Sequence, residues 1–474
     1  MSFRTGSTSA AVLALGSALL ACVSTDLGYQ DVRSLTSARI GRDVRWDEHE
    51  PGGHAHAQTR ALLAKPLDAS SAVQIALLNN QGLQAAFEEL GVARARYVQA
   101  LQLPNPTLDG ALKFRGGESQ PSIELEALMD VSQLLFVASR GGVANAEVEA
   151  AKASVTGRVL DLAFQTRVSF YEYQAAEQTL ELRHSILVAL RASFGAAENL
   201  HAAGNITDLS YANEQALYEE SRVAYTRAEA ALRAAREELS ALLGLWGKAG
   251  EWTAEPRLAD AGLAQPLPNI EGQAIERSLD LEIIRRRFEA AAKGANVARA
   301  RGWVPELRAG VTAEREEGQW GIGPAVAIQV PLFYQGQGEA GVALAQMRQE
   351  QRLYSDAAVR IRATSRAVAA RLEFAAKSAA FYMSVLLPLR ERIMKETELQ
   401  YNAMGVGIFQ LLQAKRDQIE AARSYVEVLR EYWVLRAEAD QLLAGRLPRQ
   451  PSQIEDPGGG GAGMAEPVQG AASH

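Results

Sequence analysis

The stretch PNPTLDGALKF, residues 104–114, is the part of this sequence that most limits the choice of fold. After its two prolines, apolar Leu108 and Leu112 alternate with polar Asp109 and Lys113. A period of two residues is typical of a strand that presents two different faces. Three other segments alternate in the same way, so we expect strands at about 107–115, 122–131, 306–314 and 323–331. Strands of this length cross a bilayer when they are tilted.

Four amphipathic strands are too few to close a membrane barrel, for which about eight is the smallest number. Inside a bilayer, only a helix or a closed barrel satisfies every backbone N–H and C=O group. Several copies of the chain must therefore contribute strands to one barrel, with the apolar faces outward and the polar faces lining the lumen. The lumen residues predicted in this way are Glu124, Glu126, Asp130 and Arg308.

The rest of the chain has the pattern of long helices. Proline is absent from residue 142 to 203, from 338 to 387 and from 389 to 446, and Pro388 is expected to kink or loosen its helix locally. We predict a mainly α fold with a small β part, in which long antiparallel coiled-coil helices accompany the four strands. The clearest coiled-coil seam alternates steps of three and four residues through Ile419, Ala422, Val426, Leu429 and Trp433.

Two halves of the sequence resemble each other. A turn that begins at Gly204 and one that begins at Gly405 are each followed by a long helix ending in paired leucines, at an offset of 201 residues. The interpretation is a tandem duplication, in which each half contains helix, two strands, helix, turn and helix. We place the first repeat at 67–250, a proline-containing connector at 251–269, and the second repeat at 270–446.

The N-terminus has the layout of an export signal. A positive Arg4 precedes a short apolar run, and Leu19, Ala21 and Cys22 match a bacterial lipobox, in which the cysteine accepts a lipid. Cys22 is the only cysteine in the chain. The alternative is an unmodified thiol inside an ordinary signal peptide that is cut later. We predict a lipoprotein signal peptide at 1–21, lipidation of Cys22, an irregular polar tether at 22–66 and a disordered Gly-rich tail at 447–474.

The composition argues against several classes of protein. The net charge is −7, with 49 basic against 56 acidic residues, so nucleic acid is not an expected partner. The body lacks an apolar run of about 20 residues, so no transmembrane helix is expected. His54 and His56 could bind a soft or borderline metal, but in a Gly-rich segment they are more often polar filler. We predict no catalytic residues, no cofactor and no metal site.

Three motifs, taken together, resemble the TolC-type outer-membrane efflux family over about residues 67–445. Pro104-Asn105-Pro106 opens the first strand, residues 329–336 end the fourth, and residues 401–414 form a turn and a helix start. The first-half counterpart of the second motif, residues 132–136, lacks its proline. The resemblance implies a homotrimer with a shared twelve-stranded barrel in the lipid bilayer and an α-helical tube across the periplasm. It also implies an inner-membrane pump and a periplasmic adaptor protein.

The resemblance further implies roles for the two helical tips. Adaptor docking would fall on Gly204, Asn205, Ile206, Gly405, Val406 and Gly407, although tight turns between antiparallel helices explain the same glycines. Some family members carry an acidic ring just beyond the second tip. Here Gln410 and Gln413 stand at those positions. Asp417 and Asp208 are candidates for displaced charge at the periplasmic gate, although aspartates in such positions are more often ordinary helix-surface residues. Cation block should therefore be weaker than in acid-gated relatives.

Two functions are compatible with these features. The first is a passive exit duct of a tripartite efflux pump for metal ions or small organic toxicants, lipid-anchored in the bacterial outer membrane and extending into the periplasm. The second is a structural or adhesive coiled-coil surface lipoprotein, which has no need of four amphipathic strands. Residues 401–414 most resemble members associated with metal resistance, so metal ions are the favoured substrate.

Overall fold

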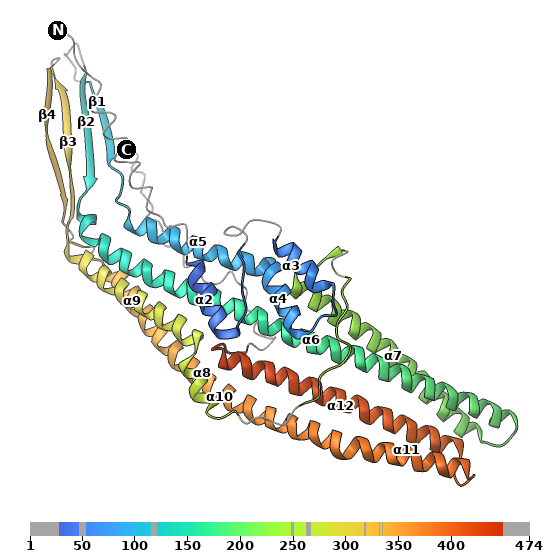
Figure 1. Ribbon diagram of the computed structural model, residues 1–474. Coiled ribbons are helices and arrows are strands. Elements are labelled where there is room, and N and C mark those ends of the chain that lie inside the picture. Colours follow the sequence, from blue (N-terminus) through green and yellow to red (C-terminus); the bar gives the residue numbers. More distant parts are fainter. Residues whose placement is uncertain are drawn as a thin grey trace.

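The computed structural model describes residues 28–46, 54–114, 121–247, 251–261, 267–316, 319–330, 332–333 and 335–448. The predicted signal peptide, Cys22 and all but the first two residues of the predicted tail lie outside this part of the chain. A small sheet forms one end of an elongated molecule, and long helices run from it to two hairpin tips at the other end (Figure 1).

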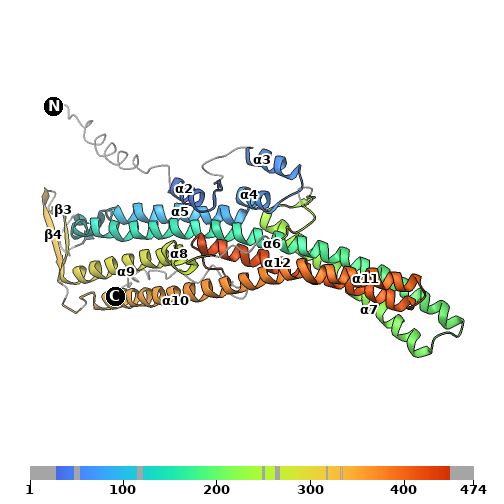
Figure 2. The same ribbon diagram turned by 60° about the horizontal axis from the view of Figure 1, so that its bottom comes forward.

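The two predicted repeats have the same order of elements. The first contains α4 (Ala69–Asn79), α5 (Gln81–Leu101), β1 (Thr107–Lys113), β2 (Ser122–Asp130), the 3-10 turn η1 (Ser132–Phe136), α6 (Val137–Ala202) and α7 (Asp208–Leu243). The second contains α8 (Ile270–Glu276), α9 (Leu279–Trp303), β3 (Glu306–Glu316), β4 (Gln319–Gln329), α10 (Gln337–Phe381), the π-helical segment η3 (Tyr382–Leu386), α11 (Leu387–Asn402) and α12 (Ile408–Leu443). The hairpins α6/α7 and α11/α12 extend in the same direction from the sheet (Figures 1 and 2).

The four strands form one antiparallel sheet in the order β1-β2-β3-β4. Three strands begin at the predicted residue, but β4 begins at Gln319 rather than 323. The predicted turn was too long because it counted Gly321 and Gly323 as turn residues. Trp320 and Ile322 continue the apolar alternation, and the glycines pair with Glu314 and Thr312 of β3.

The helices confirm the predicted coiled-coil seam and the effect of Pro388. Ile419, Val426 and Leu429 are buried, whereas Ala422 and Trp433 are partly buried. Helix α12 packs against both α6 and α10 along this seam. Just before Pro388, the helix widens into the π-helical segment η3, because proline cannot donate the backbone hydrogen bond that an α-helix needs.

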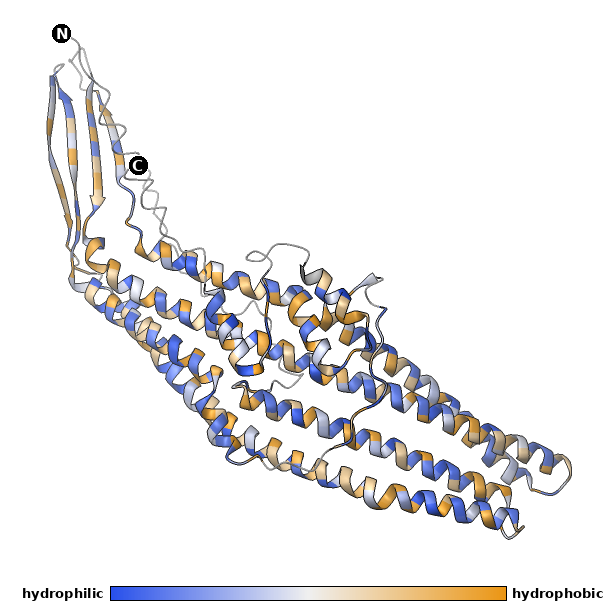
Figure 3. Ribbon diagram, in the orientation of Figure 1, coloured by the Kyte–Doolittle hydropathy of each residue, from blue (hydrophilic) through white to orange (hydrophobic). Residues whose placement is uncertain are grey.

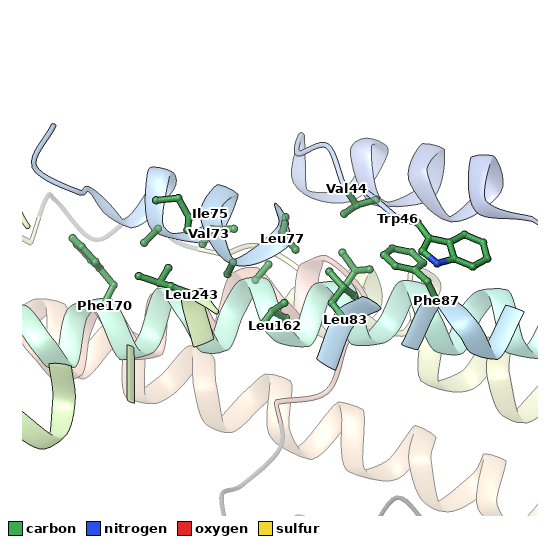
Figure 4. Close-up of a cluster of buried hydrophobic side chains, with 14 of the residues drawn as sticks. Val44, Trp46, Val73, Ile75, Leu77, Leu83, Phe87, Leu162, Phe170 and Leu243 are labelled. Carbon is green, nitrogen blue, oxygen red and sulfur yellow. The ribbon is translucent and has the colours of Figure 1, made fainter. Parts of the chain in front are cut away.

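The segment predicted as an irregular polar tether is instead partly helical and partly buried. It contains α2 (Tyr29–Ile40) and α3 (His54–Leu63), and the side chains of His54 and His56 lie outside the described part. Tyr29 donates a hydrogen bond to the Val44 carbonyl at 2.7 Å, and Trp46 stacks on Phe87 with ring centroids 5.9 Å apart. Figure 4 shows Val44, Trp46 and Phe87 within the largest core cluster. The prediction failed because two isolated aromatics leave no periodic pattern in a polar segment.

The connector lies along both repeats. Leu67 and Ala254 form a parallel β-bridge, and Trp252 is buried in the core of the first repeat. On the second repeat, the Trp433 indole donates to the Ala259 carbonyl at 2.7 Å, and Tyr425 donates to Asp260 at 3.1 Å. Burial and the Asp260 carboxylate raise the pKa of Tyr425 to about 12. These contacts hold the connector against the helices of both repeats.

Polar and apolar residues are mixed along every long helix (Figure 3). The continuous helical stretch Gln337–Asn402 nevertheless contains one window that is long and apolar enough to cross a membrane by length and composition, which we did not expect from the sequence. Only 22% of that window is buried. Phe374 and Phe381 are among the exposed apolar side chains of the stretch Gln337–Asn402, so this stretch leaves an apolar surface uncovered in the single chain.

Candidate functional sites: the polar sheet face and the hairpin tips

The strand register gathers the polar side chains on one face of the sheet. Glu126 pairs with Asp109 on one side and Thr312 on the other, and Glu124 pairs with Glu314. Asp130 pairs with Arg308, and both lie an even number of residues from these pairs along their strands. Because residues paired across an antiparallel sheet lie on the same face, all four predicted lumen residues lie together.

This polar face is strongly acidic. In the described strands its basic side chains are Lys113 and Arg308. Lys113 forms an ion pair with Glu124 at 2.5 Å, and Arg308 forms one with Glu306 at 2.8 Å, so two basic side chains face seven acidic ones. The acidic side chains of this face are Asp109, Glu124, Glu126, Asp130, Glu306, Glu314 and Glu316. A surface with this excess attracts cations.

The opposite face of the sheet is mostly apolar and exposed, and Arg315 is its charged side chain in the described strands. Leu108 is 82% exposed and Ile322 is 79% exposed, and Leu112, Val311 and Val326 are also exposed. Side chains of this kind normally face a core or a hydrocarbon phase. The sheet therefore has one face suited to water and ions and one suited to lipid.

The two tips have the same backbone but different residues. At the first tip Gly204 has φ 71°, and the Asn205 N–H donates to the Leu200 carbonyl at 2.8 Å. At the second tip Met404 has φ 59°, and the Gly405 N–H donates to the Gln400 carbonyl at 2.8 Å. Met404, not Gly405, is therefore the equivalent of Gly204, and the offset of 201 was wrong at the tips by one residue. The repeated glycine had suggested the wrong alignment.

The predicted docking residues lie in these two turns, where most of them are exposed. Ile206 and Val406 are partly buried, and the other four are exposed. Met404, which was not among the predicted docking residues, is 94% exposed. No pattern in the sequence marks a methionine in a left-handed conformation, because the identity of the residue argues against it.

The gate candidates are engaged within their own hairpins. Asp208 accepts a hydrogen bond from His201 Nε2 at 2.7 Å, and its side chain is 99% exposed. Gln413 donates to Asp417 at 2.7 Å, and Arg390 of α11 lies 3.5 Å from the same carboxylate. Asp417 therefore carries a charge that Arg390 partly balances.

Gln410 has a local role. Its side-chain carbonyl accepts a hydrogen bond from the Gly407 N–H at 3.4 Å, which helps to cap the first turn of α12. Arg390 was missed from the sequence, since its partner on α12 is known only when α11 and α12 are seen to pair. In the described part of the chain, we find no group of three or more His, Cys, Asp or Glu side chains placed to hold a metal ion.

Comparison with known proteins matches this architecture. A family model described as outer membrane efflux protein matches residues 72–245. The chain is 25% identical over 389 residues to the cobalt-zinc-cadmium resistance protein CzcC of Cupriavidus metallidurans, covering 80% of this chain and 90% of that protein. It is 24% identical over 400 residues to the probable outer membrane lipoprotein SilC of Salmonella typhimurium, covering 80% and 82%.

A solved structure has the same fold. The open state of the Neisseria gonorrhoeae MtrE outer membrane channel superposes with a TM-score of 0.66 at 18% identity, covering 81% of this chain and 90% of that one. The chain is therefore similar over most of its length to TolC-type outer-membrane efflux proteins, and it is a subunit of an outer-membrane efflux channel.

Proposed function

We propose that this subunit forms, as a homotrimer, the passive exit duct of a tripartite pump that expels divalent metal cations. The observation that carries the proposal is the acidic face that runs in register across β1 to β4. A lumen with this charge concentrates cations and repels anions. The relative named for cobalt, zinc and cadmium resistance supports the same substrate class.

Two uncovered surfaces support the trimer. β1 and β4 are the edge strands of the sheet, and their outer backbone groups need partners inside a bilayer. On the helices, Phe374, Phe381 and Met383 are exposed near η3. A second and a third copy would pair with both strand edges and cover this apolar surface. Three copies of four strands give a closed barrel of twelve.

The partners are proposed from the tips and the N-terminus. The turns between α6 and α7 and between α11 and α12 lie at the end of the molecule away from the sheet (Figure 1). Most of their residues are exposed, which suits docking of a periplasmic adaptor that in turn meets an inner-membrane pump. Cys22 would carry the lipid anchor, as in the relative described as a probable outer membrane lipoprotein. Substrates pass through the duct without chemical change, and this chain catalyses no reaction.

The charge of the lumen can be tested with the purified channel in a planar bilayer. Replacing Glu124, Glu126 and Glu314 together by glutamine should shift the reversal potential in a salt gradient toward zero, because the fixed negative charge falls. Glu237→Gln on the exposed surface of α7 is the matched control and should leave the potential unchanged. An unchanged potential in the triple variant would contradict the acidic lumen.

The substrate class is tested in a strain that lacks this chain. We expect loss of tolerance to zinc, cobalt or cadmium, restored by the native chain. Unchanged metal tolerance with lost tolerance to organic toxicants would overturn the proposed substrate but leave the duct standing. Migration of the unheated protein as a monomer in detergent would overturn the trimer and favour a structural surface lipoprotein.

A further inference from the structure

Two guanidinium groups converge on one neutral acceptor where the sheet meets the helices. Gln133 lies in η1, directly after β2, and its side-chain Oε1 accepts from Arg140 Nη1 at 2.9 Å. The same oxygen accepts from Arg301 Nη2 at 3.1 Å, although Arg301 lies in α9, just before β3. The first and second repeats thus each contribute one arginine to the same point.

Neither arginine has an anionic partner among the described residues. The nearest carboxylate in sequence, Asp130, is occupied by Ser132, whose backbone N–H donates to Oδ1 at 3.0 Å and whose hydroxyl donates to it at 2.5 Å. The Arg140 Nε–H is buried and has no hydrogen-bond partner. Burial and the charge of Arg301 lower the pKa of Arg140, and the Asp130 carboxylate, which acts without a direct ion pair, offsets only part of this.

This arrangement is unfavourable as it stands. Like charges at short range repel, and a buried N–H without a partner loses its hydration without compensation. The Gln133 oxygen and the Gln102 carbonyl, which accepts from Arg140 Nη2 at 3.5 Å, satisfy only three of the ten N–H groups that two guanidinium forks present. The neighbouring ring of Phe136 holds the Arg301 guanidinium 5.8 Å from its centroid, which positions one fork rather than neutralising it.

We propose that Arg140 and Arg301 form a binding site for a phosphate-type oxyanion at the junction of the sheet and the helices. Guanidinium forks bind phosphate with parallel N–H···O bonds, and a shared anion would relieve the repulsion between the two arginines. Arg301 is exposed, so the site opens to the surroundings, whereas Arg140 forms its half-buried floor. The phosphate is either free in solution or part of a phospholipid headgroup of the adjacent leaflet.

The site is tested by equilibrium dialysis of radiolabelled inorganic phosphate against the full chain in detergent, at constant ionic strength in chloride. We expect saturable binding of one phosphate per chain. Arg140→Gln and Arg301→Gln should each weaken binding by about tenfold or more, the loss expected for a charge-assisted hydrogen bond. Arg299→Gln, which removes an exposed arginine from the same helix, is the matched control and should bind like the native chain.

A second variant guards against loss of folding. Arg301→Lys keeps the positive charge but loses the fork, so it should bind phosphate with intermediate affinity while its circular dichroism matches the native chain. Absence of saturable binding by the native chain, or equal weakening by Arg299→Gln, would overturn the site. The lipid source is identified in nanodiscs. Suppression of phosphate binding in phosphatidylglycerol nanodiscs, but not in nanodiscs of a phosphate-free galactolipid, assigns the site to a headgroup; equal binding in both lipids assigns it to a soluble anion.

Discussion

The two hairpins share one topology but are unequally supported. α6 is an unbroken helix of 66 residues, and it packs against α2, α4, α5, α7, α9 and α12. Its counterpart is divided into α10, η3 and α11, and α11 has no buried residue. The two repeats therefore follow the same chain path, but only the long helix of the first repeat lies at the centre of the core. Buried contacts, more than the shared turn, decide how firmly each hairpin is held.

The largest effect is expected where the repeats are joined. Arg446, directly beyond α12, is 4% exposed and donates to Asp161 of α6 through Nε at 3.0 Å and through Nη2 at 2.5 Å. Its other Nη donates to Asp280 of α9. Arg446→Ala would leave Asp161 buried without its cation, so we expect a loss of about 3 to 5 kcal/mol in unfolding free energy.

Thermal unfolding followed by circular dichroism measures this loss. Arg366→Ala is the matched control, because Arg366 is 68% exposed and lies 3.6 Å from Glu271. It should cost less than about 1 kcal/mol, the usual value of a surface ion pair. Equal effects of the two variants would show that the Arg446 cluster does not join the repeats.

The next effect tests why α6 is unbroken. Val188 stands at the same distance before the first tip as Pro388 before the second, and its side chain is 55% exposed. Val188→Pro would remove one backbone hydrogen bond and clash with the preceding turn, at a cost of about 3 kcal/mol. Val188→Ala is the control and should be nearly neutral. A small loss for the proline variant would mean that α6 tolerates interruption as well as its counterpart does.

The reverse change should strengthen the second hairpin. Pro388→Ala restores an N–H donor beside η3, and we expect a gain of about 1 kcal/mol, less than the full cost of a helix proline because η3 already accommodates it. Hydrogen exchange of the amides of α11 should slow, while that of α6 stays unchanged. Faster exchange in α11 would contradict the view that Pro388 weakens this helix.

The smallest effect lies at the tips. The left-handed conformation destabilises a residue other than glycine by about 1 to 2 kcal/mol, whereas a glycine loses about 0.5 to 1 kcal/mol of stability through backbone entropy. Met404→Gly should therefore stabilise the chain by about 0.5 to 1 kcal/mol. Gly204→Ala should destabilise it by a similar amount, since a Cβ at Gly204 meets no other atom within 4 Å and only its φ opposes the change. We expect the unfolding temperature to rise in Met404→Gly and to fall in Gly204→Ala. A shift in the same direction in both variants would contradict the equivalence of Met404 and Gly204.

Local patterns in the sequence were sufficient for most of the architecture. The alternation of Leu108 and Asp109 predicted a strand because side chains in a strand point to opposite faces, whatever surrounds them. The seam from Ile419 to Trp433 predicted a paired helix, because steps of three and four residues place side chains on one face of a helix. The polar residues Glu124, Glu126, Asp130 and Arg308 were assigned to one face, and the strand register places them there.

What the sequence by itself determined was thus each strand, each long helix and the duplication, since these depend on periodicity within a few residues. Only the tertiary structure decided which separated residues meet. Asp161 and Arg446 are 285 residues apart, and Gln133 and Arg301 are 168 apart. It also decided that Tyr29 and Trp46 are buried and that Met404 takes the place of a glycine. Such contacts arise when the whole chain packs, so no local pattern encodes them.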